Sequence, residues 1–432
     1  MSDETLHGSE LGAPAGPDST RALARRAIFM LACMVPLAIL SQFYRSANGV
    51  IAPNLMADLG LTAEDIGILT GSFFIVFTLL QIPVGVLLDR FGGRNIISAM
   101  MVLAVAGSLV FATADGLTGL TVARIMIGIG CAGIMVGSLV ICSRWFLPVH
   151  YATAMSILFA FSNAGSLVAA GPLAAATSTW GWRGSYLGLA VLAAGFTLLF
   201  YLAVRDAPTD HPYHRRTPEK LMVAVVGLRE VWSFRDVAYV LPLVSVGYAT
   251  VITVLGLWGG PYLYDVYGLD EIARGKVLSI LALAMIAGTL CYGPLDRRFN
   301  SRKALVTAGA LATIAALVVL AALPNPSLVL ASVLLALFCF FGAYSLVVMA
   351  HGLSLFPGRL VGRGVTTLNM GLMGGTAVIQ VASGRLIGAV ADQAGGSADL
   401  PYRWLFLALA VLTLVALAIY RRASFTKRMT GT

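Results

Sequence analysis

The chain has 432 residues, of which 58% are hydrophobic and only 11% are charged. A water-soluble domain carries about 25% charged residues, so this composition and a mean hydropathy of +0.87 exclude a soluble globular protein. The net charge of +9 would suit a nucleic-acid partner, but the basic residues form no patch. They separate apolar stretches instead, and we expect a lipid bilayer as the partner and no nucleic acid.

Residues 1–20 are rich in Gly, Pro, Ser and acidic residues and predict a short disordered tail. The first apolar run follows three arginines and is too long for a signal-peptide core, so it predicts a retained first helix. Twelve stretches approach the roughly 20 apolar residues that a helix needs to cross a bilayer. They are predicted near 27–52, 64–88, 95–114, 117–142, 152–177, 183–204, 237–264, 273–295, 303–322, 327–355, 361–391 and 402–420.

One long polar segment, residues 205–236, divides these stretches into two sets of six. We therefore predict an all-α membrane protein with an N-terminal bundle over 21–204 and a C-terminal bundle over 237–422. The segment between them is expected to be a central cytoplasmic loop that is partly an amphipathic surface helix. Residues 423–432 are expected to form a second cytoplasmic tail.

The distribution of basic residues predicts the orientation. With the N-terminus inside, 22 of the 29 Lys and Arg residues fall on the cytoplasmic side and four fall in outer loops. This asymmetry follows the positive-inside rule and predicts that both termini are cytoplasmic. The expected location is a bacterial inner membrane.

The two sets of six also resemble each other. Trp145–Pro148 precedes the fifth span and Phe356-Pro357 precedes the eleventh, while Gly181–Arg183 and Tyr402–Trp404 open the sixth and twelfth. Such turns also recur in unrelated polytopic proteins, but the matching order favours a duplication. Two pseudo-symmetric bundles of this kind are typical of transporters that rock about a site near the midplane.

Two motifs carry a family resemblance. The loop after the second span reads GVLLDRFGGR, with a degenerate counterpart in the second half around Asp296, and the fourth span contains ARIMIGIGCAG around Arg124. Both resemble signature patterns of the major facilitator superfamily. The resemblance implies two six-helix bundles, with the first, fourth, seventh and tenth helices lining a central cavity. It also implies a gating role for the motif positions, which are Gly85, Asp89, Arg90, Gly92 and Arg94.

Three arginines, Arg45, Arg124 and Arg385, fall within predicted spans, whereas no acidic residue lies deep in any span. Charges inside a membrane are costly and usually functional, and guanidinium binds carboxylate or phosphate in a bidentate manner. We therefore expect an anionic ligand. The alternatives are that Arg45 reaches the lipid headgroups, that Arg124 binds backbone carbonyls, and that Arg385 forms an outer-gate or headgroup contact.

The end of the first span reads SQFYRSANGVIAP. It resembles the first helix of the organophosphate/phosphate antiporters and of the anion:cation symporters. That resemblance implies that Arg45 contacts the anion, with Gln42, Tyr44 and Asn48 nearby. The further basic residue of those families in the seventh helix has no match, and this chain offers Tyr248 and Trp258 there instead.

Neutral polar residues inside the spans could line the cavity or simply join helices. Asn163 and Gln380 are the preferred cavity candidates, and Tyr344 fits either the core or the cavity. His351 could carry a proton, because imidazole titrates near neutral pH, or it could be a packing residue.

No phosphate-binding loop, metal-ligand cluster or nucleophile–base pair is apparent in the sequence, so we expect no enzyme, cofactor or metal site. The first hypothesis is a monomeric secondary transporter for a small anion, with a proton as a possible coupling ion. A second hypothesis is a proton-driven exporter of drugs or metabolites. A third, from another class, is a non-transporting membrane sensor or assembly partner.

Overall fold

The computed structural model describes residues 17–208, 230–298, 301–357 and 360–423, and the regular structure within these ranges is helical. Ten helical stretches are long and apolar enough to cross a membrane, and a pair bent by 50°, α3 (Ala63–Leu79) and α4 (Gln81–Phe91), adds an eleventh. The twelfth comes from α8 (Pro148–Ala203), whose 56 residues would span about 84 Å if straight. Gly181, at φ 66° and ψ 172°, breaks α8 into two spans. Twelve spans are therefore confirmed in the described ranges.

The other helices follow the predicted order. In the first half they are α1 (Pro17–Ser46), α2 (Asn48–Leu59), α5 (Gly93–Thr113), α6 (Leu117–Ala132) and α7 (Ile134–Trp145). In the second half they are α10 (Arg235–Thr253), the π-helical turn η2 (Val254–Trp258), α11 (Gly259–Tyr267), α12 (Glu271–Arg298), α13 (Arg302–Ala322), α14 (Leu328–Gly342), α15 (Tyr344–Leu353), α16 (Val361–Ala391) and α17 (Leu400–Tyr420).

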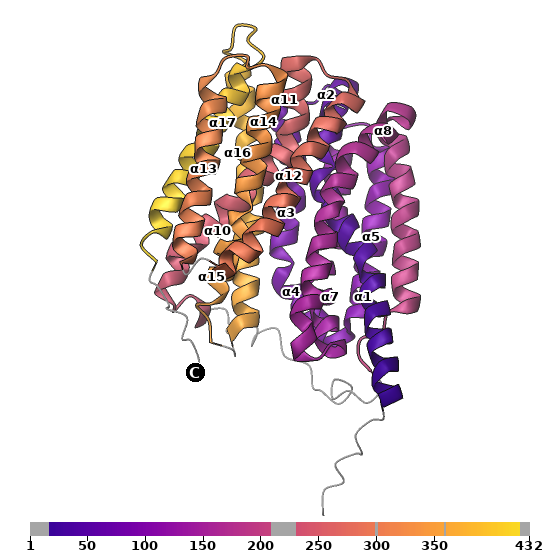
Figure 1. The fold of residues 1–432 in the computed structure, drawn as a ribbon. Helices are drawn as coiled ribbons and strands as arrows, with labels where there is room; N and C mark the ends of the chain where they lie inside the picture. Colours follow the sequence, from indigo (N-terminus) through magenta and orange to yellow (C-terminus); the bar gives the residue numbers. More distant parts are fainter. Residues whose placement is uncertain (1–16, 209–229, 299–300, 358–359, 424–432) are drawn as a thin grey trace, which may run out of the picture.

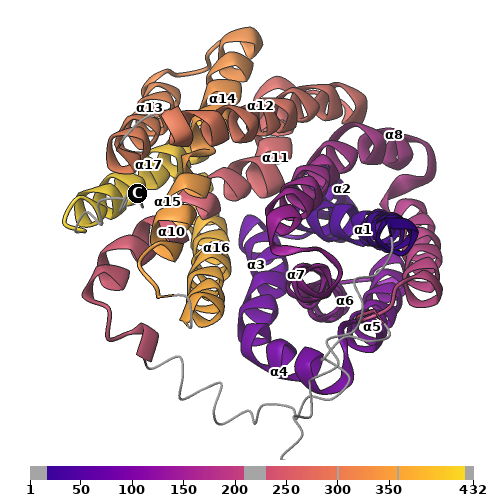
Figure 2. The same ribbon diagram turned by 60° about the horizontal axis from the view of Figure 1, so that its bottom comes forward.

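The helices form two bundles that lie side by side, as Figures 1 and 2 show. In the first bundle α1 packs on α8, and α5 lies between α6 and α8. The two bundles meet along α3 and α16, along α8 and α12, and where α2 contacts η2 and α11. We call the end where α1 begins and α17 ends the termini side, which is at the bottom of Figure 1, and the opposite end the far side.

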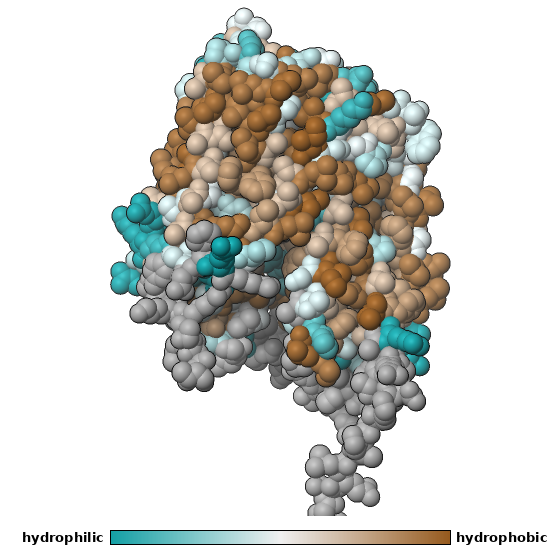
Figure 3. All heavy atoms as spheres, in the orientation of Figure 1, coloured by the Kyte–Doolittle hydropathy of each residue, from teal (hydrophilic) through white to brown (hydrophobic). Residues whose placement is uncertain are grey.

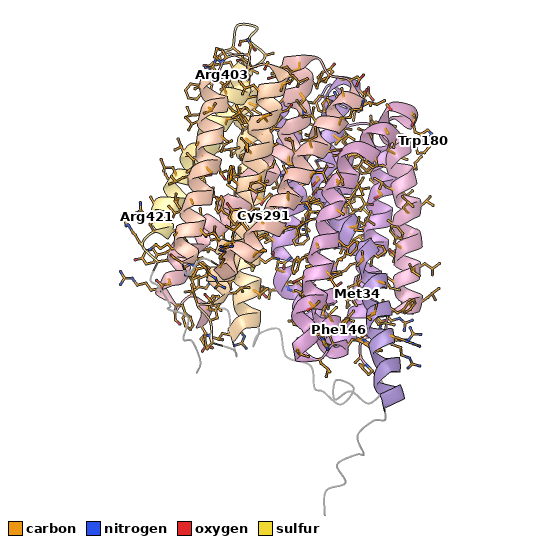
Figure 4. The ribbon with its side chains drawn as sticks, viewed as in Figure 1. Met34, Phe146, Trp180, Cys291, Arg403 and Arg421 are labelled. Carbon is orange, nitrogen blue, oxygen red and sulfur yellow. The ribbon has the colours of Figure 1, made fainter. Side chains whose placement is uncertain are left out.

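The flank of the molecule is apolar. Large hydrophobic side chains such as Val191, Leu290 and Val411 are exposed, and apolar residues cover much of the flank in Figure 3. Charged residues lie near the two ends, as Arg403 and Arg421 do at opposite ends of α17 in Figure 4. A belt of exposed apolar side chains between charged ends is the surface that a bilayer requires.

The two halves are separated by a gap between described helices. Helix α8 ends at Ala203 and α10 begins at Arg235. The amphipathic helix predicted within 205–236 falls largely on residues 209–229, which lie outside the described residues, as do most of the two predicted tails.

Candidate functional site

Arg45 lies near the end of α1, in the membrane-spanning part of the first bundle, and is only 7% exposed. Its Nη1 donates a hydrogen bond to Oε1 of Gln42 at 3.2 Å, and its guanidinium carbon lies 4.8 Å from the centre of the Phe77 ring. Its Nε has no hydrogen-bond partner, and no described carboxylate forms an ion pair with it. A buried cation compensated only by an amide and a ring is well suited to an anionic ligand.

Serine side chains hold Gln42 in place. Nε2 of Gln42 donates to Oγ of Ser166 at 3.1 Å, and the Ser46 hydroxyl lies 3.1 Å from the same oxygen. Ser166 reaches this position because α8 approaches α1 so closely that a Cβ atom at Gly165 would overlap the carbonyl oxygen of Ile39. The sequence analysis missed Ser166, because a serine in an apolar span carries no signal of its partner.

Arg124 is fully buried on α6. Its Nη1 donates to the carbonyl oxygen of Tyr44 at 2.9 Å, its Nε and Nη2 make no well-aligned hydrogen bond with the described residues, and the Tyr186 hydroxyl lies close to the guanidinium. Its guanidinium lies 4.8 Å from the Phe73 ring centre. Gly128, one turn along α6, permits this contact, because a Cβ atom there would lie 2.8 Å from the Phe73 carbonyl oxygen.

Arg45 of α1 and Arg124 of α6 each lie over a phenylalanine ring of α3. The rings of Phe73 and Phe77, one turn apart on α3, lie 6.0 Å from each other at an angle of 29°, and each carries one guanidinium. Each of these buried cations pays a desolvation cost of several kcal/mol in a low-dielectric interior. An anion bound beside either guanidinium would offset part of this cost.

The second bundle adds neutral polar groups beside Arg45. A Cβ atom at Gly256, in η2, would lie 3.2 Å from the Arg45 carbonyl oxygen. Nε1 of Trp258 donates to Oγ of Ser383 at 2.7 Å, and that hydroxyl donates to the carbonyl oxygen of Gln380 at 2.8 Å. A π-helical turn inside an α-helix often marks a functional site.

Other predicted binding residues are less closely tied to this site. The Tyr44 hydroxyl lies 2.7 Å from Oγ of Ser108, so its side chain points toward α5, and only its backbone meets Arg124. Asn163 and Tyr248 are half-buried, and the Tyr248 hydroxyl has no partner within the described part of the chain.

Two predicted residues belong to the interior of the second bundle. The Tyr344 ring packs against Gly247 and Gly309, so the structure places it in the core rather than beside Arg45. Nδ1 of His351 lies 2.8 Å from the Tyr420 hydroxyl in the same hydrophobic cluster. This contact matches the packing alternative for His351.

The turn after the second span is held by a residue that the sequence analysis did not single out. Gly92 has φ 83°, and a Cβ atom there would overlap the Asp206 carboxylate. Asp206 accepts a hydrogen bond from the backbone N–H of Arg94 at 2.9 Å, near the start of α5. At Gly85, by contrast, a Cβ atom would meet nothing within 4 Å, so no other helix approaches this motif position closely.

The other motif residues lie at the termini side. Asp89 and Arg90 are exposed at the end of α4, and the Arg90 guanidinium lies 5.2 Å from the Phe91 ring centre. In the second half, Asp296 accepts two-pronged hydrogen bonds from Arg302, with Nε 2.9 Å from Oδ1.

One ion pair and one hydrogen bond from a buried arginine join the bundles at the far side. Nε of Arg385 lies 2.9 Å from Oε1 of Glu64, and these side chains are 66% and 48% exposed. The expectation of three uncompensated arginines is therefore corrected to two. Arg274, counted from the sequence as an outer-loop cation, is 1% exposed and donates to Oδ1 of Asn54 across the seam at 3.3 Å.

Twelve spans in two bundles, with polar groups buried where the bundles meet, define a polytopic membrane protein of the transporter type. The family model of the Major Facilitator Superfamily matches residues 34–379. The chain therefore belongs to the major facilitator superfamily, a family of membrane transporters rather than enzymes.

Individual relatives match at low identity. The chain is 25% identical over 297 residues to the nitrate/nitrite transporter NrtP of Picosynechococcus sp., covering 59% of this chain and 53% of that protein. It is 23% identical over 284 residues to the "Probable sulfoacetate transporter SauU" of Cupriavidus necator, covering 63% and 65%. The matches thus span about half to two thirds of these relatives.

The fold is shared with solved structures. A bacterial homologue of the human lysosomal transporter Spinster, in an inward-facing and unoccupied conformation, superimposes with a TM-score of 0.74 at 19% identity. The match covers 92% of this chain and 97% of that one. At this identity the likeness concerns the fold.

Proposed function

We propose that this protein is a secondary transporter that carries a small anion across the membrane by alternating access. The observation that carries the proposal is the pair of buried guanidinium groups of Arg45 and Arg124 over adjoining rings of α3, with unbonded nitrogens and no carboxylate partner among the described residues. Arg45 would bind the charge, and Arg124 would contribute its field and its N–H groups.

The relatives support an anionic cargo, since the names of two of them concern nitrate or nitrite and sulfoacetate. Sulfoacetate and nitrate differ in size but share oxygen atoms that carry negative charge. Guanidinium binds such oxygens in pairs. The shared chemistry favours the arginine pair as the charge-recognising element.

Close approaches between the bundles support a carrier that is closed on the far side. A Cβ atom at Gly384 would lie 2.6 Å from the Ala63 carbonyl oxygen, and one at Gly49 would lie 2.8 Å from that of Leu255. Together with the Arg385–Glu64 pair, these contacts join the bundles on the far side of Arg45. With the termini in the cytoplasm, a carrier in this state would exchange the anion with the cytoplasm. It would act as a monomer.

Counterflow in proteoliposomes tests the proposal. We expect a radiolabelled anion from a panel of nitrate, phosphate, sulfonates and carboxylates to exchange, and we expect Arg45→Gln to abolish exchange. Arg45→Lys should retain only a small part of it, because lysine keeps the charge but loses the two-pronged geometry. Arg421→Gln, at an exposed helix end, is the charge-matched control.

Three results would count against this proposal. Normal exchange of every anion by a well-folded Arg45→Gln protein would show that the charge is recognised elsewhere. Exchange of cationic drugs driven by a proton gradient, with no anion exchanged, would favour the exporter hypothesis instead. Binding of a protein partner without exchange of any solute would favour the sensor.

A further inference from the structure

Segments from both bundles meet beside Arg45. A Cβ atom at Gly49 of α2 would lie 2.8 Å from the Leu255 carbonyl oxygen in η2. A Cβ atom at Gly67 of α3 would lie 2.9 Å from the Gln380 carbonyl oxygen in α16. We call the place where α2, α3, η2 and α16 meet the junction.

Asn48 presents a hydrogen-bond acceptor at the junction. The hydrogen bonds of Thr70 show which atom of the Asn48 side-chain amide this acceptor is. The Thr70 hydroxyl donates to the Ile66 carbonyl oxygen at 2.9 Å, so it must accept from Nδ2 of Asn48, which lies 2.7 Å away. Oδ1 of Asn48 is therefore the remaining atom, and it is buried without a partner among the described residues. A buried acceptor left without a donor is costly, so a ligand that supplies the donor is favoured here.

Gln380 presents both a donor and an acceptor. Residues of an α-helix follow each other by about 100°, which places Gln380 between two occupied faces of α16. On one side Ala377, Val381 and Gly384 contact α3, and on the other side Ser383 accepts from Trp258 of η2. The Gln380 side chain thus points between α3 and η2, and both its Nε2 and its Oε1 are buried and unbonded in the described structure.

Arg45 supplies the charge from one helical turn before Asn48, with its guanidinium carbon 4.8 Å from the centre of the Phe77 ring. Asn48 follows it by three residues, so the two side chains share one helix face, and the Arg45 carbonyl oxygen contacts η2. The unmet groups at the junction are one donor, Nε2 of Gln380, and two acceptors, Oδ1 of Asn48 and Oε1 of Gln380, and Nε of Arg45 is a further unmet donor one helical turn before Asn48. An anion without hydroxyl groups can satisfy the donors but neither acceptor.

We infer that the carried anion bears its own hydroxyl donors, with a hydroxycarboxylate as the substrate class, and that Asn48 and Gln380 recognise the hydroxyl groups. This inference rests on the proposed anion transport and narrows it. The carboxylate accepts from Arg45 and from Nε2 of Gln380, while hydroxyl groups donate to Oδ1 of Asn48 and Oε1 of Gln380. Hydrogen phosphate shares the chemistry of an anion with a hydroxyl group and is the other source to be distinguished.

Competition in the counterflow assay with the full-length protein tests this assignment. The probes are the matched pairs tartrate with succinate and lactate with propionate, together with nitrate and inorganic phosphate. We expect the hydroxylated member of at least one pair to compete about tenfold or more better than its partner, since a site built for a hydroxyl rejects the analogue that lacks it. Phosphate competing better than every carboxylate would replace the hydroxycarboxylate by hydrogen phosphate.

Gln380→Met is the main variant, because the Gln380 side chain makes no hydrogen bond within the described protein and its loss leaves the other contacts in place. We expect the preference for the hydroxylated acid to fall to about threefold or less, and the deoxy acid to compete less well too, because its carboxylate loses the hydrogen bond from Nε2. Asn48→Leu should act in the same direction. Gln393→Met, at an exposed glutamine just beyond α16, is the matched control.

The outcomes separate this inference from the proposed function. If anions exchange in an Arg45-dependent manner but nitrate or the deoxy acids compete as well as the hydroxylated acids, the hydroxyl assignment is wrong and anion transport stands. An unchanged preference in both Gln380→Met and Asn48→Leu would also overturn it. If no anion exchanges at all, both proposals fail.

Discussion

The seam between α3 and α16 offers a sharp test of how tightly the bundles close on the far side. In Gly384→Ala the added Cβ atom would lie 2.6 Å from the carbonyl oxygen of Ala63 and 3.0 Å from Cα of Gly67. Ordinary van der Waals contact begins at 3.4 Å, so α16 must move away from backbone atoms by about 0.8 Å. Overpacking of this kind costs about 1–3 kcal/mol, which corresponds to a change of about 5- to 150-fold in the population of the closed far side.

Distances between spin labels can measure this change. Labels at Asp115 and Gln393, exposed on the far side of the first and second bundles, should move apart in Gly384→Ala. Counterflow should slow as well, because the state closed on the far side is less populated. The control is Gly388→Ala, one turn further along α16, where a Cβ atom would meet nothing within 4 Å. If Gly384→Ala keeps the parent label distances and exchange rate, the seam is not a rigid contact and the reasoning is wrong.

Three further predictions concern the ends of the helices. Asp206→Ala should lower the free energy of unfolding by about 1–2 kcal/mol, measured by thermal denaturation, because the N–H groups that begin α5 lose a charged acceptor. Arg385→Gln should change exchange by less than about fivefold, unlike Arg45→Gln, because an exposed ion pair contributes under about 1 kcal/mol; complete loss of exchange would make Arg385 a ligand. Burial raises the pKa of Asp399, but hydrogen bonds from Ser397 and from the Asn325 N–H outweigh it, so the pKa lies below its ordinary value. The resulting stability is present at neutral pH and is lost as the pH falls below about 4, so the melting temperature of Asp399→Asn should fall less on acidification than that of the parent.

The twelve spans and their ends could be predicted from the sequence because they depend on local composition. A stretch of about 20 apolar residues in a bilayer must satisfy its own backbone hydrogen bonds, and a helix does so within the segment. Arg45 and Arg124 stood out for a similar reason, since an arginine in an apolar stretch is costly wherever its helix packs.

Partners of the polar side chains could not be predicted, because they depend on which helices become neighbours. The structure alone shows that Tyr44 turns its hydroxyl toward Ser108, that Arg385 is paired with Glu64, and that Arg274 is buried at the seam. Each of these contacts joins residues that are far apart in the chain, and rotating either helix by about 100°, the angle of one residue, would break it. Composition determined that the chain would cross the membrane as helices, whereas packing decided which buried charges kept no protein partner and so remained available to a ligand.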